Sequence, residues 1–597
     1  MKIIVFGLAL SLLLSGMLVA VGGEAIVCEE SMEKEMEGTE VESSSPNSES
    51  ITQNNNKNYT EINDWRALNN ISDDLDGHYE LVDPGEGELT EENDGYDHLV
   101  DTEEGWYPIG DSDEPFTGTF NGNNTRIRDL YIDRPTNDTV GLFGAIGEGA
   151  EVTNLTIYQG EVTGEENVGG LVGDNNGNVT NSYVEEVEVN GEDTVGGLVG
   201  QNSGNILNSS AAAEVTGEDS VGGLSGVVES DGWINNSHAE GDVSGDGDEL
   251  GGLIGSNSGK VYNSSAEGDV SGIWGSVLSL EPGSEDVGGL LGKNDGIVNN
   301  SYATGNVGGY SNVGGFVGDN DGTISNSSAT GNVIGDWYFI GGLAGINKDT
   351  IENSSATGKV VGDTRYVGGL VGANQDTIET SYATGDVSVD PDGGLAVGGL
   401  VGENLGDVER SFATGDVSGG VRAGGLVGRN VDTVENTYAL GDVSGGLRVG
   451  GLVGENVDTV STSYSAGKVA VGIPGEVGGL IGADLDSVSD SYWDIEASGI
   501  DSSQGGEGLT TDEMTGEDAP YNMDGFDFEE IWDTVEEDHE DADEDGYPIL
   551  QDLSREKQLK HVYPSGDRVI IPGFTSTLFT LVVVLAIVIQ TKRRDIE

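Results

Sequence analysis

The sequence predicts an all-β protein whose main part is a β-solenoid, a stack of about 13 coils with a cap at each end. Gly-Gly followed by Leu or Phe recurs at 171, 198, 224, 253, 290, 316, 343, 370, 400, 426, 452 and 480, with a degenerate member at Leu142. Each repeat divides into three short apolar pieces separated by Gly, Asn or Asp, which are too short for helices but suit strands bounded by turns. Repetition at this period is the sequence signature of a solenoid.

One column of the aligned repeats holds small apolar residues and predicts the inner lining, because a narrow interior has room only for small side chains. Val387, of the same strand parity as Ala383, is also expected inside. Three residues before the alanine, the column of Asn353, Thr380 and Arg410 is expected to face water, since an unpaired arginine is not buried. A bend must separate that column from the preceding apolar residue. The inner column includes Ala239, Ala266, Ala303, Ala329, Ala356, Ala383 and Ala413.

A second Asn column follows the glycine-rich phrase VGGLVG. Asn tolerates left-handed backbone and caps turns through its amide, and residues stacked at one corner can hydrogen-bond into a ladder along the axis. The glycines are expected to allow a sharp corner and close packing of one coil on the next. The Asn positions are 175, 202, 257, 294, 320, 347, 374, 404, 430 and 456.

The repeated pattern GGLVGxN…NSYATGxV resembles the GLUG repeat of microbial surface proteins, over about residues 140–495. The preceding FTGTFNGNNTRIRDL resembles the first rungs of pectate-lyase-like right-handed β-helices. The resemblance implies a right-handed parallel β-helix, with an N-terminal cap and first rungs over 61–139 and a C-terminal cap over 496–553. Such caps are needed because open end coils expose unpaired strand edges.

Both ends of the chain carry membrane-directed signals. Residues 1–25 have one Lys, an apolar run and small residues, the layout of a secretory signal peptide. An acidic disordered linker is expected over 26–60 and a juxtamembrane linker over 554–571. Residues 572–597 hold a membrane-length apolar run followed by basic residues, which places the C-terminus inside and the bulk of the chain outside.

The tripeptide Pro572, Gly573 and Phe574, before that apolar run, resembles the PGF-type C-terminal sorting signal of archaea. In that family an archaeosortase removes the helix and leaves a lipid attached, and the signal is associated with heavily glycosylated surface proteins. A Thr-rich stalk commonly precedes the tripeptide, whereas a charged stretch precedes it here. A plain transmembrane span therefore remains the alternative.

The charge is strongly one-sided, with 108 Asp and Glu against 24 Lys and Arg and a formal net charge of −84. Such a field repels nucleic acid, so no nucleic-acid partner is expected. At molar salt the Debye length falls to about 3 Å and the repulsion largely vanishes. We interpret the charge as an adaptation to a very salty medium, as in the surface proteins of salt-loving archaea.

No pattern in the chain indicates a catalytic site. The histidines lack zinc-protease spacing, no Ser has a nucleophile-elbow context, and carboxylates are too numerous for one pair to be singled out. Basic residues are scarce in the coils, and Arg410, Arg422, Arg429 and Arg448 are assigned to different columns. We therefore expect no enzyme, with a carbohydrate-active β-helix lyase or hydrolase as the alternative.

A calcium site is the one cofactor hypothesis. Asp541, Asp543 and Asp545 match the opening of a calcium loop, with Asp552 at the twelfth position. The usual Glu is missing there and Pro548 interrupts the loop, so a solvated acidic surface is the competing interpretation.

N-glycosylation sequons are numerous, and those in the water-facing column are expected to be accessible for modification. They begin at Asn58, Asn70, Asn123, Asn137, Asn154, Asn178, Asn208, Asn235, Asn263, Asn299, Asn326 and Asn353. The sequence as a whole predicts a secreted, C-terminally anchored cell-surface protein with a structural or adhesive role in the envelope. Its expected partners are the membrane, the processing enzyme, and surface glycans or neighbouring cells.

Overall fold

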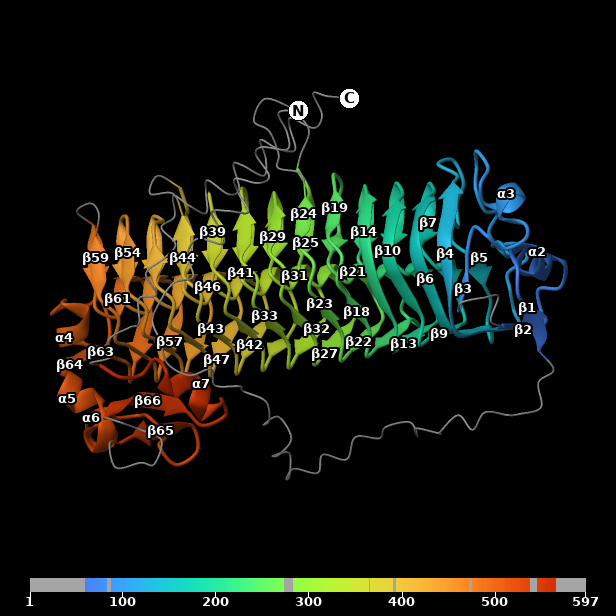
Figure 1. The fold of residues 1–597 in the computed structure, drawn as a ribbon. Coiled ribbons are helices and arrows are strands. Elements are labelled where there is room, and N and C mark those ends of the chain that lie inside the picture. Colours follow the sequence, from blue (N-terminus) through green and yellow to red (C-terminus); the bar gives the residue numbers. More distant parts are fainter. Residues whose placement is uncertain are drawn as a thin grey trace, which may run out of the picture. The chain divides into compact units, whose positions relative to one another are not determined.

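The computed structural model describes residues 59–564, apart from 83–86, 273–282, 364, 390–392, 472–474 and 537–544. The expected signal peptide and sorting signal lie outside the described residues. Within them, parallel strands stack into a β-solenoid with few short helices, which confirms the predicted fold class (Figure 1). The solenoid has 13 coils, because each coil contributes one strand to a 13-stranded sheet that extends from β5 (Phe143–Ile146) to β61 (Ile481–Asp484).

One coil illustrates the architecture. Its first strand belongs to a 12-stranded sheet, its second to the 13-stranded sheet, and the remaining three to a 39-stranded sheet. Every strand pairs in parallel with its equivalents in the coils before and after it, so that Ala383 pairs with Ala356 and Ala413. The five strands are β40 (Tyr366–Gly368), β41 (Val371–Asn374), β42 (Thr377–Glu379), β43 (Tyr382–Ala383) and β44 (Val387–Val389).

The predicted alanine column lines the interior. Its members at 239, 266, 303, 329, 356, 383 and 413 are all 0% exposed, and Val387 is 0% exposed too. A Cβ built on Gly315 would lie 3.2 Å from the Cβ of Ala329, so the two walls of the tube are already in contact at this point. The interior therefore has no room for larger side chains in this column.

The glycine phrase is explained by coil stacking. A Cβ on Gly314 would overlap the carbonyl oxygen of Val317, one on Gly315 the carbonyl oxygen of Gly342, and one on Gly318 the backbone of Asp286. These glycines do not have the positive φ values found elsewhere in the chain. The expected close packing of coils is thus confirmed, whereas a left-handed corner is not the reason for these glycines.

The second Asn column forms the predicted ladder. Its members are 0% exposed, and successive side chains are joined from Nδ2 to Oδ1, for example Asn294 to Asn320 at 2.8 Å and Asn320 to Asn347 at 2.8 Å. The Oδ1 atoms of Asn175, Asn257 and Asn294 also accept from a turn amide, in the last case from Gly296 N at 3.2 Å. The ladder is interrupted where Val228 takes the Asn position.

A left-handed residue in each coil makes the expected bend. Its φ is 50° at Asn326, 48° at Asn353 and 44° at Arg410, so the chain turns and this side chain points outward while Ile324 stays 0% exposed inside. One part of the expectation was wrong. Thr380 is only 7% exposed, because the C-terminal segment covers this column in the last coils.

A serine ladder, which the sequence reasoning missed, follows that bend. The backbone N–H of a serine donates to the Oγ of the next coil's serine, as from Ser327 to Ser354 at 3.2 Å, and the serine Oγ donates to a carbonyl two residues earlier in its own coil. One member of the column is Thr437, whose N–H donates to Ser463 Oγ at 3.1 Å. The members are Ser182, Ser209, Ser237, Ser264, Ser301, Ser327, Ser354, Ser381, Ser411, Thr437, Ser463 and Ser491.

Short helices and aromatic packing precede the first coils. Trp65 is 0% exposed on α2 and its ring lies 5.7 Å from that of Trp106, whose indole N–H donates to the carbonyl of Leu142 at 3.2 Å. Asp64 caps α2 by accepting from Ala67 N at 2.7 Å. The described helices are α2 (Trp65–Asn69), α3 (Tyr96–Leu99), α4 (Ile495–Ser498), α5 (Thr511–Met514), α6 (Ala519–Asn522) and α7 (Arg555–Leu559). None of the helices in this part of the chain has the length and apolar character to cross a bilayer.

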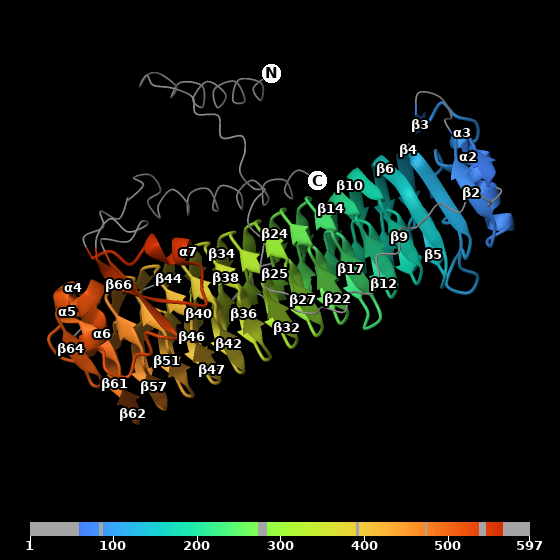
Figure 2. The same cartoon turned by 90° about the horizontal axis from the view of Figure 1, so that it is seen from below.

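The C-terminal segment closes the last coil and then folds back along the outside of the stack (Figure 2). Strand β64 (Glu507–Leu509) pairs with the last coil's β63 (Tyr492–Asp494), and β65 (Trp532–Val535) pairs antiparallel with β66 (Gly546–Leu550). The C-terminal segment and the last coils share a second hydrophobic core, and helix α7 contributes Leu559 to it. This helix lies within residues 554–571, which were expected to be a linker. We call residues 499–564 the C-terminal cap.

An aromatic column anchors the cap on the coils. Tyr382, Phe412, Tyr438 and Tyr464 stack face to face at 4.9, 4.8 and 5.2 Å, on the outer side of the alanine column. Tyr438 donates to Gln558 at 2.9 Å and Tyr464 to the carbonyl of Pro548 at 2.6 Å. Among the residues that the structure describes, the cap contacts the outer face from the coil of Tyr382 onward.

Candidate interaction surface

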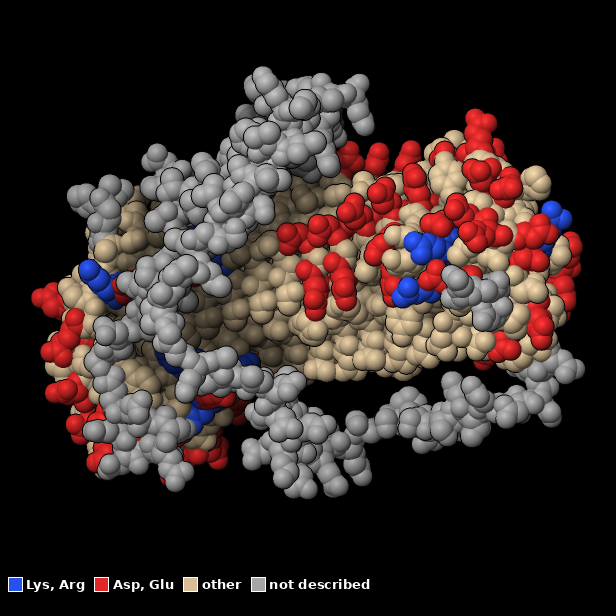
Figure 3. Space-filling model, in the orientation of Figure 1, with Lys and Arg blue, Asp and Glu red and all other residues tan. Residues whose placement is uncertain are grey.

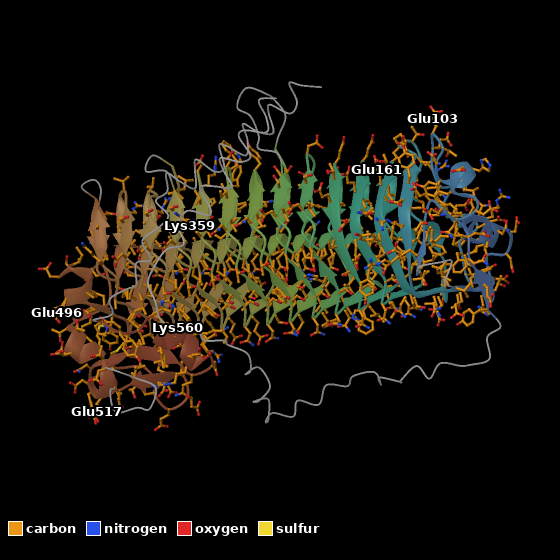
Figure 4. All side chains as sticks on the ribbon, viewed as in Figure 1. Glu103, Glu161, Lys359, Glu496, Glu517 and Lys560 are labelled. Atoms are coloured by element: carbon orange, nitrogen blue, oxygen red, sulfur yellow. The ribbon has the colours of Figure 1, made fainter. Side chains whose placement is uncertain are left out.

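Acidic side chains follow the outer face of the third strand of the large sheet. Figure 3 shows these acidic side chains as red rows over the N-terminal coils. Figure 4 labels Glu161, at the start of the column that they form, and Lys359, which occupies the equivalent position in a later coil. The column is in register from coil to coil, and Asp269 N donates to Asp242 Oδ1 at 2.9 Å. Several exposed carboxylates thus accept a hydrogen bond from the backbone of the next coil in addition to carrying a negative charge. The acidic run at its start is Glu161, Glu188, Glu214, Asp242 and Asp269.

The arginines are not scattered as the sequence analysis placed them. Arg422 and Arg448 occupy the same register position on neighbouring coils, which corrects the assignment to different columns. Both contact Glu455, Arg448 at 2.6 Å, and Arg429 joins them at 3.7 Å from Glu455 and 2.6 Å from Glu403. Arg448 also lies 3.1 Å from Glu476, so the three arginines face three carboxylates, and these ion pairs join neighbouring coils.

An aromatic corner lies on three consecutive coils, between the third strand of the large sheet and the next strand of the 12-stranded sheet. It comprises Tyr310, Trp337, Tyr338, Phe339, Arg365 and Tyr366. The rings of Tyr310 and Trp337 stack at 5.9 Å and 7°, and those of Phe339 and Tyr366 at 5.5 Å and 12°. Trp337 is 37% exposed, and the other members of the corner are partly exposed.

Charged groups border the aromatic corner. The guanidinium of Arg365 lies 4.4 Å from the ring centre of Tyr338, a cation–π contact that orients both side chains. Burial, with the nearby Asp363 charge, raises the pKa of Asp336 to about 6. Flat rings beside a carboxylate and a guanidinium offer both stacking faces and hydrogen-bonding groups to a ligand. Periodicity hid this surface from sequence reasoning, because the corner is where repeats differ most.

A partly buried carboxylate, that of Asp286, lies on β25 (Glu285–Gly288) in the 12-stranded sheet. Burial raises the pKa of Asp286 to about 7, although Asn312 Nδ2 donates to its Oδ1 at 2.7 Å. Its φ of 55° places it in a column of left-handed residues. Burial therefore favours the protonated form of Asp286 relative to an exposed aspartate.

The calcium hypothesis receives no support from the described residues, among which no three His, Cys, Asp or Glu side chains group to hold an ion. Asp541 and Asp543 lie outside the described residues. Asp552 forms an ion pair with Arg410 at 3.0 Å, and Asp545 lies beside Gly516. Two of the four proposed ligands are therefore placed in the C-terminal cap, and calcium binding stays a prediction.

The predicted sequons fall on one side of each coil. Asn58 lies outside the described residues, as does the tripeptide from Pro572 to Phe574. Asn70, Asn123 and Asn137 are exposed before the first full coil, and Asn208, Asn263, Asn326 and Asn353 are exposed on the left-handed column. The remaining members, Asn154, Asn178, Asn235 and Asn299, are partly exposed.

Comparisons with known proteins agree with the repeat prediction. A family model described as the GLUG motif matches residues 309–334, 363–388 and 393–418. Halomucin from Haloquadratum walsbyi is 36% identical over 119 residues, which are 19% of this chain and 1% of halomucin. A Gly-rich membrane protein from Evansella cellulosilytica is 43% identical over 76 residues, 12% of this chain and 9% of that protein. The chain thus spans a small part of these relatives, and no solved structure matches it.

Proposed function

We propose that this protein is a secreted, non-enzymatic component of the cell envelope that holds an adhesive surface away from the membrane. The relatives named halomucin and Gly-rich membrane protein support a surface location. The stacked ladders support a rigid spacer, because each coil is fixed to its neighbours by backbone pairing and by buried Asn and Ser side chains. The acidic surface suits a salty exterior.

The observation that carries the adhesive part of the proposal is the aromatic corner. Exposed stacked rings are unusual on a surface otherwise dominated by carboxylates and small polar side chains, and exposed apolar groups gathered in one place mark binding sites. The proposed ligand is carbohydrate on a neighbouring cell or envelope polymer. Its C–H faces would lie on Trp337 and Tyr366, and its hydroxyls would donate to Asp336.

The test compares two variants in cells that make the full-length protein. The double variant, Trp337→Ala with Tyr366→Ala, should show less cell aggregation than the unchanged protein and weaker retention on envelope polysaccharide. Leu447→Ala is the matched control, because Leu447 is 47% exposed at the same corner of another coil. Equal aggregation by all three proteins would contradict the adhesive proposal, and shortened polysaccharide in the binding assay would favour the lyase or hydrolase alternative.

The proposed anchoring has its own test. If the tripeptide at 572–574 is read by an archaeosortase, mature protein should lack peptides from 575–590 and carry lipid. Recovery of those peptides from the mature protein would favour a plain transmembrane span. If the segment is a plain transmembrane span, replacement of Pro572 and Phe574 should leave the apparent mass of the mature protein unchanged. If the segment is normally removed, the same replacement should block its removal and give a longer mature protein.

A further inference from the structure

The sequons of the solenoid are distributed one to a coil. From the coil of β5 to that of β36 (Ala344–Asn347), each of eight successive coils contains a single Asn-x-Ser/Thr, and none of the five coils from β41 to β61 contains one, which accounts for all 13. The sequon asparagines, in coil order, are Asn154, Asn178, Asn208, Asn235, Asn263, Asn299, Asn326 and Asn353.

Backbone geometry explains part of this pattern. The left-handed position favours Asn, and the following position belongs to the serine ladder, so Asn-Ser is expected in any coil. The residue after that decides whether a sequon results. It is Ser or Thr in the coils of Asn154, Asn208, Asn263, Asn326 and Asn353, which gives a sequon at the left-handed position itself.

Geometry does not explain the remaining coils. Asn181, Asn236 and Asn300 also occupy left-handed positions, with φ of 49°, 52° and 52°, but Tyr or His stands two residues later and no sequon begins there. Each of these coils instead has an additional Asn one or three residues earlier that restores a sequon. These asparagines are Asn178, Asn235 and Asn299.

The sequons stop where the C-terminal cap begins. In the coils without sequons, Thr380 and Asn436 of the same column are 7% and 8% exposed, and Arg410 is bound to Asp552 of the cap. At the last coil, a Cβ on Gly525 of the cap would lie 2.6 Å from the Cβ of Asp490. A glycan on this face would collide with the cap.

From these observations we propose that the uncovered face carries a single file of N-linked glycans, one attached to each coil. The proposal rests on the extracellular location proposed above. In each attachment the side-chain Nδ2 forms a bond to C1 of an oligosaccharide, the bond from C1 to the phosphate oxygen of its lipid-linked carrier breaks, and the amide releases one proton. The lipid phosphate leaves with the bonding electrons.

The hydrogen bonds of this face are compatible with attachment. Asn236 Nδ2 donates to Asn208 Oδ1 at 2.8 Å, and Asn300 Nδ2 donates to Asn263 Oδ1 at 2.6 Å. Asn208 and Asn263 thus accept these bonds through their oxygens. Three sequon asparagines also donate through Nδ2: Asn154 to Asn121 Oδ1 at 3.0 Å, Asn263 to Asn235 Oδ1 at 2.8 Å and Asn299 to Ser325 Oγ at 2.7 Å. Because the amide nitrogen has two hydrogens and attachment of a sugar removes one, the other can keep such a bond. Since coils are about 4.8 Å apart, neighbouring glycans would touch and form a continuous cover along this face.

The experiment starts with protein isolated from the cells that make it. Surface protease digestion first establishes whether the protein is outside, and glycopeptide mass spectrometry then measures each sequon. Glycans on most of the eight coils are expected, and Ser328→Ala should remove the glycan of Asn326 alone. A surface-exposed protein with unmodified sequons would overturn the proposal and leave the proposed function standing, whereas an intracellular protein would overturn the proposed function.

A matched pair tests the link to the cap. Glu352→Asn and Glu379→Asn each create a sequon one residue before the left-handed position, in an uncovered and a covered coil respectively. Glu352→Asn is made together with Ser355→Ala, which removes the sequon of Asn353, so that each of the two coils has a single sequon. The first should gain a glycan with no change in protease resistance of the cap. The second should either stay unmodified or gain a glycan and lose cap protection. A glycan on the second with the cap still protected would contradict the inferred exclusion.

Discussion

Ala329 and Asn326 offer a direct test of which side chains face inward. They lie three residues apart in one coil that the cap leaves uncovered. Ala329 is 0% exposed, between Ala303 and Ala356, whereas Asn326 is exposed with a φ of 50°. The same substitution, Ala329→Asp or Asn326→Asp, therefore places one carboxyl inside the tube and one in water.

The expected energies differ widely. An Asp kept neutral at pH 7 inside the tube needs its pKa raised from about 3.9 to above 7, which costs at least about 4 kcal/mol at about 1.36 kcal/mol per pKa unit. Its extra volume adds about 1–3 kcal/mol, because the facing Gly315 leaves no space. Asn326→Asp should change stability by less than about 0.5 kcal/mol, since Asp tolerates left-handed backbone and this position is solvated.

Thermal unfolding followed by circular dichroism in molar salt should show a large loss for Ala329→Asp and almost none for Asn326→Asp. Hydrogen exchange measured by mass spectrometry should locate the damage in the coil of Ala329 and its neighbours, because coils contact only adjacent coils. A more damaging Asn326→Asp would refute the assignment of inner and outer columns, and with it the accessible glycan face.

Three further predictions concern salt, packing and pH. The acidic run from Glu161 to Asp269 places like charges about 4.8 Å apart, and each adjacent pair repels by about 0.7 kcal/mol at 0.01 M salt but by about 0.2 kcal/mol at 1 M. Circular dichroism should therefore show β-structure lost on dialysis into dilute buffer and regained at molar salt; equal stability in both would contradict the salt adaptation. Gly315→Ala should lower stability by about 1–3 kcal/mol in denaturant titration, because its Cβ meets the next coil's backbone, whereas Thr323→Ala on the same coil should be nearly neutral. Asp286 has its folded pKa raised to about 7, so the stability it contributes is present below about pH 4 and lost as pH rises through 7. Asp286→Asn should thus raise the melting temperature at pH 8 and leave it unchanged at pH 4, and an equal effect at both pH values would show that the carboxyl is not perturbed.

Because the repeats can be aligned, the residues that line the interior of the coils could be predicted from the sequence. The alanine and asparagine columns recur in register, and a small or amide side chain in every repeat points to one shared environment. The cap could not be read in this way, because its contacts join residues far apart in the chain, such as Arg410 with Asp552 and Tyr438 with Gln558. Thr380 was assigned to water for this reason, since its own coil gives no sign of the segment that covers it.

The aromatic corner was missed for the opposite reason. Column analysis averages over repeats, and the equivalent positions of this corner hold different residues: Tyr310 lies beside Trp337, and Tyr338 and Leu395 lie beside Arg365. The serine ladder was overlooked because its residues were treated as part of the sequon. Its donor is the backbone N–H of one coil and its acceptor a side chain of the next, a pairing that no pattern within a single repeat reveals.

The position of the cap leaves the length of the stack open to change. Among the described residues it contacts the coils from Tyr382 to Tyr492, while the N-terminal helices pack at the other end. Between them, a duplicated or deleted repeat would meet the same neighbours as before. Duplication or deletion of a repeat could therefore lengthen or shorten the solenoid in steps of about 4.8 Å without any new interface being required. The length of the solenoid could thus evolve independently of the two ends.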